Sequence, residues 1–350
     1  MQNGNKQMTV GVIGCGRIAE SAHFPALSKI EGVKIKYACD LIKEKAEKFG
    51  AERVTTDYHE LISDPEVDAV WVLTPNASHY DITLDALAAG KHVFCEKPIT
   101  VSYEKAVIMA KAAEAAGKNL QIGVCNRFHR SVKEIRELVR SGKLGEIYHV
   151  YCSFRSRRGI PGLGGPFTMK SESGGGVLID WGVHFMDIIL YVLGGAKIRT
   201  VSANTYSKLG RDIPAYRYNS MWAGPPVLDG INDVEEFVTG FIRTDSASIS
   251  FNGAWAQNIA EKDPMHIDFL GDKGGARLIY RKDYSVFYND LTEIHSEGEI
   301  PDMYLEEDAA FIASIRTGEK NDGDISNILE SQKLLDCIYK SAELKREVTL

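Results

Sequence analysis

The chain has 350 residues, enough for two domains with substantial cores, and a formal net charge of −7 at pH 7. The acidic balance and the lack of a dominant basic run argue against nucleic acid as the main partner. The polar first residues lack a signal-peptide core, and no apolar run approaches the ~20 residues of a membrane span, so we expect a soluble, cytoplasmic protein with no membrane partner.

The cysteines also indicate a reducing compartment. They are Cys15, Cys39, Cys95, Cys125, Cys152 and Cys337, and none forms a C-x-x-C pair. Several fall in predicted strands. We therefore expect buried free thiols rather than disulfides, and no metal site.

The first element is an apolar strand at 8–13 that runs into Gly14-x-Gly16-x-x-Ala19 and then into a helical pattern. This is the dinucleotide-binding fingerprint. Gly14 permits the tight turn, Gly16 allows close approach of a pyrophosphate, and the small Ala19 lets the helix pack on the strand. The motif predicts a nicotinamide dinucleotide as cofactor.

The second strand, at 33–39, ends at Asp40. An acid at this position can accept hydrogen bonds from both ribose hydroxyls and would repel a 2′-phosphate. No arginine follows at once, so we expect NAD in preference to NADP. The alternative is that Asp40 caps a helix at 42–49, a role that is compatible with ribose binding.

Strands and helices alternate up to about residue 125. The predicted strands are 8–13, 33–39, 53–55, 69–73, 91–95 and 119–124, and helical patterns lie at 18–30, 42–49, 58–62, 79–89 and 103–116. This alternation predicts a parallel, doubly wound Rossmann sheet with right-handed crossovers.

The fifth of these strands is followed by Glu96, Lys97 and Pro98. Ligands of open α/β sheets bind beyond the carboxyl ends of strands, so Lys97 can donate to a reacting oxygen there. Pro98 stiffens the turn. An ordinary strand end with a solvated ion pair is the alternative, weakened by the glycine motif in the same sheet.

After residue 126 the pattern changes. A helix at 131–140 is followed by long β-like runs at 146–154, 198–206, 237–244, 246–256, 266–270 and 276–280, and helices return at 303–316 and 325–344. We expect an α/β fold in two domains. These are a Rossmann domain at 1–125 and a domain at 126–350 with one large, mainly antiparallel open sheet. The C-terminal helices can pack back on the first domain.

One helix, predicted at 177–193, interrupts these strands. Asp180 and His184 lie four residues apart and share a face of it. Histidine is suited to proton transfer near neutral pH, and a carboxylate can orient it. The three glycines at 174–176 are expected to allow a ligand to approach. An Asp–His pair that only braces a helix is the alternative.

Six segments together resemble the Gfo/Idh/MocA oxidoreductases, the relatives of glucose–fructose oxidoreductase and inositol dehydrogenase. They are 14–19, 74–79, 96–98, 127–128, 142–147 and 174–184, and 271–274 resembles a family turn. The resemblance implies hydride transfer between nicotinamide C4 and a ring carbinol carbon of a polyol. It also implies a homo-oligomer, a dimer or tetramer, formed through the open C-terminal sheet.

The resemblance further implies individual roles. His184 would take the hydroxyl proton, Lys97 would stabilise the reacting oxygen, and Asp180 would position His184 or another hydroxyl. The implied cofactor contacts are Gly14, Gly16, Arg17, Ile18, Asp40, Thr74, Pro75, Asn76, His79, Glu96, Lys97 and Asn126, the last at a position that varies in the family. The expected substrate contacts are Lys97, Arg127, Arg155, Arg157, Arg158, Asp180, Trp181 and His184.

Two loops bear on the substrate. Residues 155–170 are rich in glycine and arginine and predict a flexible loop over the active-site mouth; a solvated hairpin is the alternative. Residues 216–222 carry aromatics suited to stacking on a sugar, or to surface packing. The pattern faintly resembles relatives that oxidise the C3 hydroxyl of glucosides, so a glucoside-like pyranose is the leading expected substrate.

Two other functions stay open. One is a reductase of a non-sugar carbonyl or dihydrodiol, and the other is a non-enzymatic NAD-sensing regulator on the same fold. The presence of Asp180 and His184 favours polyol oxidation over the first. A regulator is expected to lose Lys97 or His184, and both are present.

Overall fold

The structure, a computed structural model, describes residues 7–218, 221–260 and 265–350. The chain divides into two compact units: Met1–Phe128 with Asp302–Leu329, and His129–Pro301 with Glu330–Leu350. The division differs from the expected 1–125 and 126–350 because residues 302–329, assigned to the second domain, belong to the first unit.

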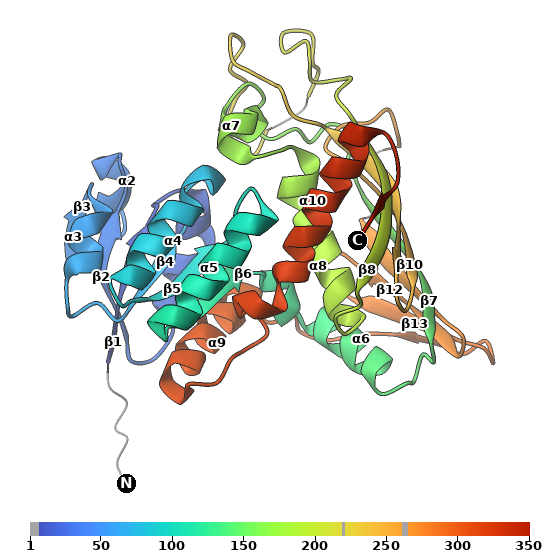
Figure 1. The fold of residues 1–350 in the computed structure, drawn as a ribbon, viewed down its shortest axis with the longest axis horizontal. Helices are drawn as coiled ribbons and strands as arrows, with labels where there is room; N and C mark the ends of the chain where they lie inside the picture. The colour runs from blue at the N-terminus through green and yellow to red at the C-terminus, as the bar shows by residue number, and fades with distance from the viewer. Residues whose placement is uncertain (1–6, 219–220, 261–264) are drawn as a thin grey trace. The chain divides into compact units, whose positions relative to one another are not determined.

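The first unit is built on a six-stranded parallel sheet with strand order β3-β2-β1-β4-β5-β6 (Figure 1). The strands are β1 (Met8–Ile13), β2 (Val33–Cys39), β3 (Arg53–Thr55), β4 (Ala69–Val72), β5 (His92–Glu96) and β6 (Leu120–Gly123). The order reverses between β1 and β4, which is the switch point where ligands of doubly wound sheets bind. The predicted Rossmann sheet is confirmed.

Helices cover both faces of this sheet. They are α1 (Phe24–Leu27), α2 (Lys43–Glu47), α3 (Tyr58–Ser63), α4 (His79–Ala88), α5 (Tyr103–Ala116) and α9 (Met303–Thr317), with short 3-10 turns η2 (Asn76–Ser78), η3 (Cys125–Phe128) and η6 (Ile325–Asn327). The predicted helix at 18–30 starts instead as a π-helical turn, η1 (Ala19–His23). Pro25 follows this turn and has no N–H to donate, which accounts for the break in the regular ladder.

One face of the sheet is closed by the late helix α9. Trp71 of β4 and Phe94 of β5 are fully buried, and Phe311 of α9 packs edge-on against both rings at centroid distances of 5.3 and 5.9 Å. Residues near the C-terminus therefore complete the core of the N-terminal sheet.

The second unit holds a nine-stranded sheet with order β14-β13-β12-β11-β7-β10-β9-β8-β15. The strands are β7 (Ile147–Arg155), β8 (Ile198–Tyr206), β9 (Phe237–Thr244), β10 (Ser248–Ala254), β11 (His266–Gly271), β12 (Gly274–Ile279), β13 (Tyr284–Tyr288), β14 (Glu293–His295) and β15 (Val348–Thr349). All neighbours are antiparallel except β10 and β7. The predicted antiparallel character is confirmed, although the short strands β13, β14 and β15 were not predicted.

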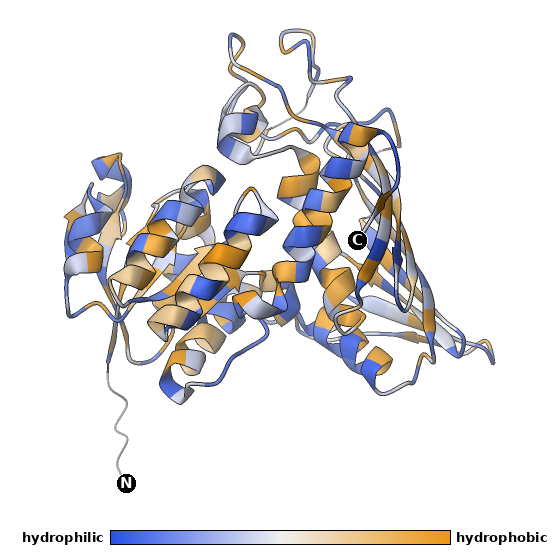
Figure 2. Ribbon diagram, in the orientation of Figure 1, coloured by the Kyte–Doolittle hydropathy of each residue, from blue (hydrophilic) through white to orange (hydrophobic). Residues whose placement is uncertain are grey.

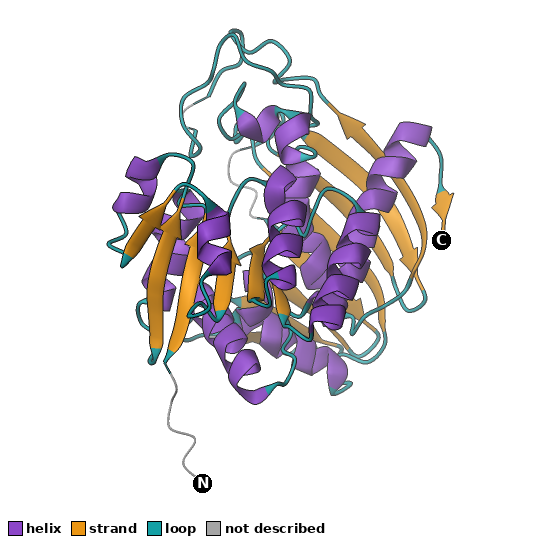
Figure 3. Ribbon diagram, turned by 60° about the vertical axis from the view of Figure 1, so that its left-hand side comes forward, coloured by secondary structure: helices purple, strands orange, loops and turns teal. Residues whose placement is uncertain are grey.

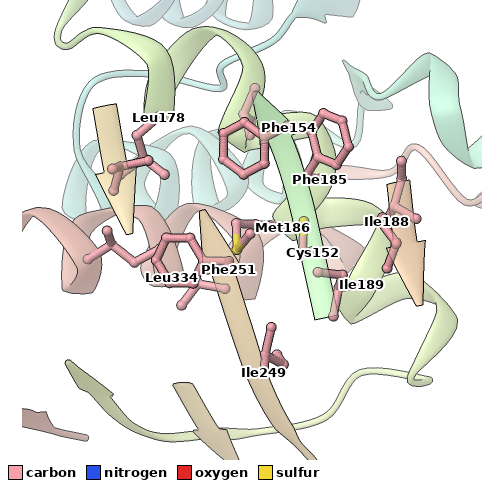
Figure 4. Close-up of a cluster of buried hydrophobic side chains, with 14 of the residues drawn as sticks. Cys152, Phe154, Leu178, Phe185, Met186, Ile188, Ile189, Ile249, Phe251 and Leu334 are labelled. Carbon is pink, nitrogen blue, oxygen red and sulfur yellow. The ribbon is translucent and has the colours of Figure 1, made fainter. Parts of the chain in front are cut away.

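Helices α6 (Arg130–Arg140), α8 (Val183–Val192) and α10 (Leu329–Leu344) pack on one face of this sheet (Figure 3). Figure 2 shows alternating hydrophobic and hydrophilic bands along α10, the pattern of a helix with one buried side. In the core, Phe154 of β7 stacks on Phe185 of α8 with centroids 4.7 Å apart (Figure 4).

Among the described residues, one helical stretch, Lys170–Val192, has the length and apolar composition of a membrane span. However, 83% of its most apolar window is buried inside the structure. It includes α7 (Lys170–Ser173), a π-helical turn η5 (Leu178–Gly182) and α8. Packing against the nine-stranded sheet accounts for its hydrophobicity.

Candidate active site

The glycine turn after β1 has the geometry that the motif predicts. Gly14 has φ of +94°, and a Cβ there would lie 2.7 Å from the Leu73 carbonyl oxygen. At Gly16, by contrast, a Cβ would meet no heavy atom of the described residues within 4 Å. Gly14 is thus required by the fold, while Gly16 leaves the backbone open to a ligand, as a dinucleotide needs. Arg17 beside it is exposed, and Ile18 packs against the core.

Asp40 faces this turn from the end of β2. Its Oδ2 accepts the Cys15 N–H at 2.9 Å and its Oδ1 accepts the Ile42 N–H at 2.9 Å. Helix α2 begins only at Lys43 and has no side-chain cap, so Asp40 is not its N-cap. Each carboxylate oxygen keeps a further lone pair for a ribose hydroxyl.

The loop after β4 is tied to the Pro98 turn by His79. Its Nδ1 lies 2.8 Å from the Pro98 carbonyl oxygen and its Nε2 lies 2.8 Å from that of Thr74. Burial lowers the pKa of His79, but Cys95 and the two carbonyls outweigh it and raise the pKa to about 9. Both ring nitrogens of His79 thus join two loops, and the predicted cofactor contact of this residue stays a prediction.

Other predicted residues of this loop are more accessible. Pro75 is exposed, and Thr74 and Asn76 are half-buried. They lie after the carboxyl end of β4, beside the switch point of the sheet. Asn126, by contrast, is buried in η3.

Lys97 follows a buried charge cluster that sequence reasoning missed. Glu96 Oε2 accepts the Lys97 backbone N–H at 2.8 Å, and Glu96 Oε1 lies 3.0 Å from His23 Nε2. On its other side, His23 Nδ1 lies 3.0 Å from Asp308 Oδ1, which also accepts the Trp71 indole N–H at 3.0 Å. We call His23, Glu96 and Asp308 the imidazolium cluster.

Electrostatics fix the charges of this cluster. Burial opposes charge on His23, but Asp308 and Glu96 outweigh it and hold its pKa well above the ordinary value. Burial likewise opposes charge on Glu96, yet hydrogen bonding to His23 lowers the pKa of its carboxyl. Glu96 is thus a buried carboxylate that fixes the backbone at Lys97. The implied cofactor contact of Glu96 stays a prediction.

Arg127 has an internal role that the sequence did not predict. It is only 3% exposed, and its guanidinium donates to the carbonyl oxygens of Asp322 at 2.9 Å and Asn327 at 3.1 Å. A buried guanidinium needs such acceptors, because its charge and donors have lost water. Arg127 therefore joins η3 to the returning segment of the first unit, and its expected substrate contact stays a prediction.

In the second unit, Asp180 and His184 lie on the more exposed side of their helix. Asp180, Trp181 and His184 are half-buried, whereas Ile179 and Val183 are buried. The Val183 N–H donates to the Leu178 carbonyl five residues back, so the turn holding Asp180 is wider than an α-helical one. π-Helical turns are frequent at functional sites.

Both side chains have neighbours that directly follow strands of the sheet. The Trp255 indole N–H donates to Asp180 Oδ2 at 3.2 Å, and the His184 ring lies 6.4 Å from the Tyr280 ring. Trp181 packs against the core of the second unit. These contacts orient a carboxylate and an imidazole on one helix face, an arrangement suited to proton transfer.

The glycines before this helix serve an internal purpose. A Cβ at Gly175 would overlap the Tyr339 hydroxyl, and one at Gly176 would overlap the Glu235 carbonyl oxygen. At Gly175 and Gly176 the space expected for a ligand is therefore taken by the protein's own side chain and backbone.

Residues 155–170 are largely irregular, as predicted, but part of the segment is packed inside the protein. Ile160 and Leu163 are buried, and the Val227 N–H donates to the Leu163 carbonyl at 2.9 Å. A Cβ at Gly164 would overlap the Val227 carbonyl oxygen. The glycines thus reflect close packing of this segment on residues 227–233.

The three arginines of this segment differ. Arg158 donates to the Gln257 carbonyl at 3.0 Å and to Asn258 Oδ1 at 2.8 Å, so it joins two loops. Arg155 Nε donates to Ser153 Oγ at 3.1 Å, whereas Arg157 is exposed. Of the three, Arg158 has a clear internal role that the sequence did not predict.

The aromatic segment is only partly described. Tyr216 is buried, while Tyr218 and Trp222 are 41% and 43% exposed. The Trp222 ring packs edge-on against Phe167 at 4.9 Å. Asn219 and Ser220 lie outside the described residues.

Comparisons with known proteins agree with these features. The model of the GFO/IDH/MocA family, described as an oxidoreductase family with an NAD-binding Rossmann fold, matches residues 8–124, and the family's C-terminal domain matches residues 132–277. The chain is 32% identical to D-glucoside 3-dehydrogenase of Escherichia coli K12, over 98% of this chain and 97% of that protein. It is 28% identical to myo-inositol 2-dehydrogenase of Thermotoga maritima, over 98% of each.

Solved structures share the fold. A levoglucosan dehydrogenase in complex with NADH and levoglucosan superposes with a TM-score of 0.82 at 21% identity, covering 98% of this chain and 99% of that one.

Proposed function

This chain belongs to the GFO/IDH/MocA oxidoreductase family, and from that premise we propose that it is an NAD-dependent dehydrogenase of a glucoside-like pyranose. The reaction is hydride transfer between nicotinamide C4 and a secondary ring hydroxyl or ketone, with C3 as the leading position. The observation that carries this proposal is the 32% identity, over 98% of this chain, to a relative named D-glucoside 3-dehydrogenase.

The roles of the residues follow from their chemistry. NAD, when bound, would supply the hydride acceptor. His184 takes the proton of the reacting hydroxyl, and Asp180, oriented by Trp255, positions His184 or a neighbouring substrate hydroxyl. Lys97 donates to the reacting oxygen and stabilises its developing negative charge. The bond from Glu96 to the Lys97 N–H fixes the backbone from which this amine extends.

The test is a panel of NAD-reduction assays with glucosides, aldoses, cyclitols and their deoxy analogues. We expect turnover of a pyranose and a large loss when hydroxyls beside the reacting carbon are removed, because polar groups of the site are left unpaired. Lys97→Ala and His184→Ala should each lower kcat by roughly 10²-fold or more. The exposed Lys143→Ala is the control.

Two results would contradict the proposal. Turnover of open-chain or aromatic carbonyls without any pyranose or cyclitol would favour the reductase. Near-parental kcat of His184→Ala on a confirmed substrate would remove it as the base.

The preference for NAD over NADP is proposed on Asp40. Its carboxylate is held against the glycine turn by the Cys15 N–H and would repel a 2′-phosphate. Fluorescence titration should give weaker binding of NADPH than of NADH. Asp40→Asn keeps a carbonyl acceptor but removes the charge, so it should narrow the preference. Equal affinity of the parent for both cofactors would contradict the assignment.

A second copy of the chain is the partner that we propose for the open sheet. No helix of the described residues lies on its outer face (Figure 1). On that face Tyr151 is 51% exposed and packs edge-on against His149, whose ring stacks on Phe241. Light scattering should give a dimer or tetramer, and Tyr151→Glu should dissociate it. A monomeric parent would overturn this proposal.

A reducing, cytoplasmic location is proposed on the cysteines. All six are free and buried. Burial raises the pKa of Cys15 and Cys39 to about 12, which suppresses the reactive thiolate.

A further inference from the structure

The helix that carries Asp180 and His184 has no local cap. Its first residues follow glycines at 174–176, and the structure gives no side-chain cap at Val177. The unpaired N–H groups at a helix start must find acceptors, and a helix without them is poorly fixed. The acceptors here come from a residue far along the chain.

That residue is Glu235, just before β9. Its Oε2 accepts the Gly176 N–H at 3.0 Å and its Oε1 accepts the Leu178 N–H at 3.0 Å. Its backbone carbonyl accepts the Val177 N–H at 3.1 Å. Three consecutive donors of the helix start thus end on one residue.

A second helix fixes Glu235 in turn. The Tyr339 hydroxyl of α10 donates to Glu235 Oε1 at 2.9 Å. The space for both groups exists because positions 175 and 176 are glycines, where a Cβ would overlap the Tyr339 hydroxyl and the Glu235 carbonyl oxygen. Side chain, hydroxyl and glycines form one interlocking arrangement.

The next residue, Glu236, holds a different segment. Its carboxylate accepts the backbone N–H groups of Lys208, of Leu209 at 2.9 Å and of Gly210 at 3.3 Å. These begin the long excursion between β8 and β9, which contains the aromatic segment. The Glu236 carbonyl also accepts the Trp255 N–H at 2.8 Å, and the Trp255 indole bonds Asp180.

We propose that Glu235 and Glu236 are positioning residues, each of which fixes a different segment of the second unit. Glu235 sets the position of the Asp180–His184 helix, and Glu236 sets the position of residues 208–210, where the chain enters the excursion that holds Tyr216 and Trp222. This inference rests on the proposed dehydrogenase function and concerns two residues whose carboxylates accept backbone N–H groups of the protein.

In the experiment, the alanine variants of Glu235 and Glu236 serve as matched controls for each other. Glu235→Ala and Glu236→Ala remove equal side chains at adjacent buried positions. On the pyranose that the parent oxidises, Glu235→Ala should lower kcat on the order of 10- to 100-fold, since small misplacements of reacting groups are costly. Glu236→Ala should instead raise KM roughly tenfold with kcat nearly kept, the signature of lost uniform binding. NADH affinity by fluorescence titration should not change in either.

More conservative substitutions test whether the lost activity returns when the hydrogen bonds are partly kept. Glu235→Gln keeps one carbonyl acceptor and should retain most of the kcat that Glu235→Ala loses, while Tyr339→Phe should have a smaller effect. These variants also test the inference if an alanine variant does not fold. If the variants at both positions changed kcat and KM in the same way, the inference would be wrong.

Amide hydrogen exchange separates this inference from the proposed function, because it needs no substrate. Changes at Glu235 should speed exchange at 174–184 and spare 207–211, and changes at Glu236 should do the reverse. If the parent oxidises no pyranose, the proposed function fails while this exchange pattern still supports the positioning roles. Unchanged exchange at 174–184 in both Glu235 variants would overturn them.

Discussion

Glu96 in the first unit and Glu235 in the second are both buried, yet the pKa of Glu96 is lowered and the pKa of Glu235 is raised. Burial raises the pKa of each. Hydrogen bonding to His23 outweighs burial at Glu96 and lowers its pKa, whereas the neutral donors around Glu235 do not, so its pKa stays raised. The hydrogen-bond partner therefore decides how readily a buried acid ionises. A neighbouring imidazolium stabilises the charged carboxylate, whereas neutral N–H and O–H donors mainly hold the side chain in position.

Glu307 of α9 extends this comparison. Both of its carboxyl oxygens are buried, and neither has a hydrogen-bond partner among the described residues. Burial, together with the negative charges of Glu96 and Asp308, raises its pKa well above the ordinary value. The raised pKa favours the neutral form of this carboxyl.

The largest effect is expected from His23→Leu. It removes the cation between two buried carboxylates, and breaking such a pair costs about 3–5 kcal/mol. Urea unfolding at pH 7 measures the loss. A loss below about 1 kcal/mol would mean that the imidazolium cluster is not charged as described.

A smaller effect with a diagnostic pH dependence is expected from Glu96→Gln. The loss at pH 7 should be about 2 kcal/mol, because a charge-assisted hydrogen bond becomes neutral. Since the folded pKa of Glu96 is lowered, its contribution is present above the unfolded value near pH ~4.3 and is lost as pH falls through the folded value. The difference from the parent should therefore shrink on acidification.

Glu235→Gln is the contrasting case. Its cost at pH 7 should be about 1 kcal/mol, the typical net contribution of one hydrogen bond. The folded pKa of Glu235 is raised, so its contribution is full below the unfolded value and is lost as pH rises through the folded value. Unfolding curves from pH 4 to 8 should thus give opposite slopes for the two variants, and parallel slopes would contradict the comparison.

The smallest effect, with the opposite sign, is expected from Glu307→Met. Methionine has a similar length and no polar atoms to desolvate, so we expect a gain of about 1 kcal/mol. The gain should increase as pH rises from about 4.3, because the parent's protonated carboxyl becomes costly to maintain. A clear loss of stability would indicate a partner for this carboxyl.

The parts of the fold that local sequence determines were predicted well. The six Rossmann strands follow from short apolar runs bounded by turn residues, and Gly14 and Asp40 from the spacing of one βαβ unit. Strands β8 and β9 were predicted with their observed bounds.

The features that the sequence did not predict involve residues whose partners lie far away in the sequence. His23 meets Asp308 across 285 positions, and Glu235 meets Gly176 across 59, and nothing in the local pattern marks either pair. The same holds for the glycines at 164 and 176. Their composition predicted flexibility or ligand access, whereas the structure uses them for close packing against the carbonyls of Val227 and Glu235.

The return of α9 to the first unit has a consequence for synthesis on the ribosome. Until residues 302–317 have emerged, the nascent Rossmann sheet lacks Phe311, which closes the face formed by Trp71 and Phe94, and Asp308, which balances His23. The N-terminal unit therefore cannot finish folding first, as N-terminal domains commonly do. The apolar face formed by Trp71 and Phe94 therefore lacks its cover while every strand of the nine-stranded sheet except β15 is translated.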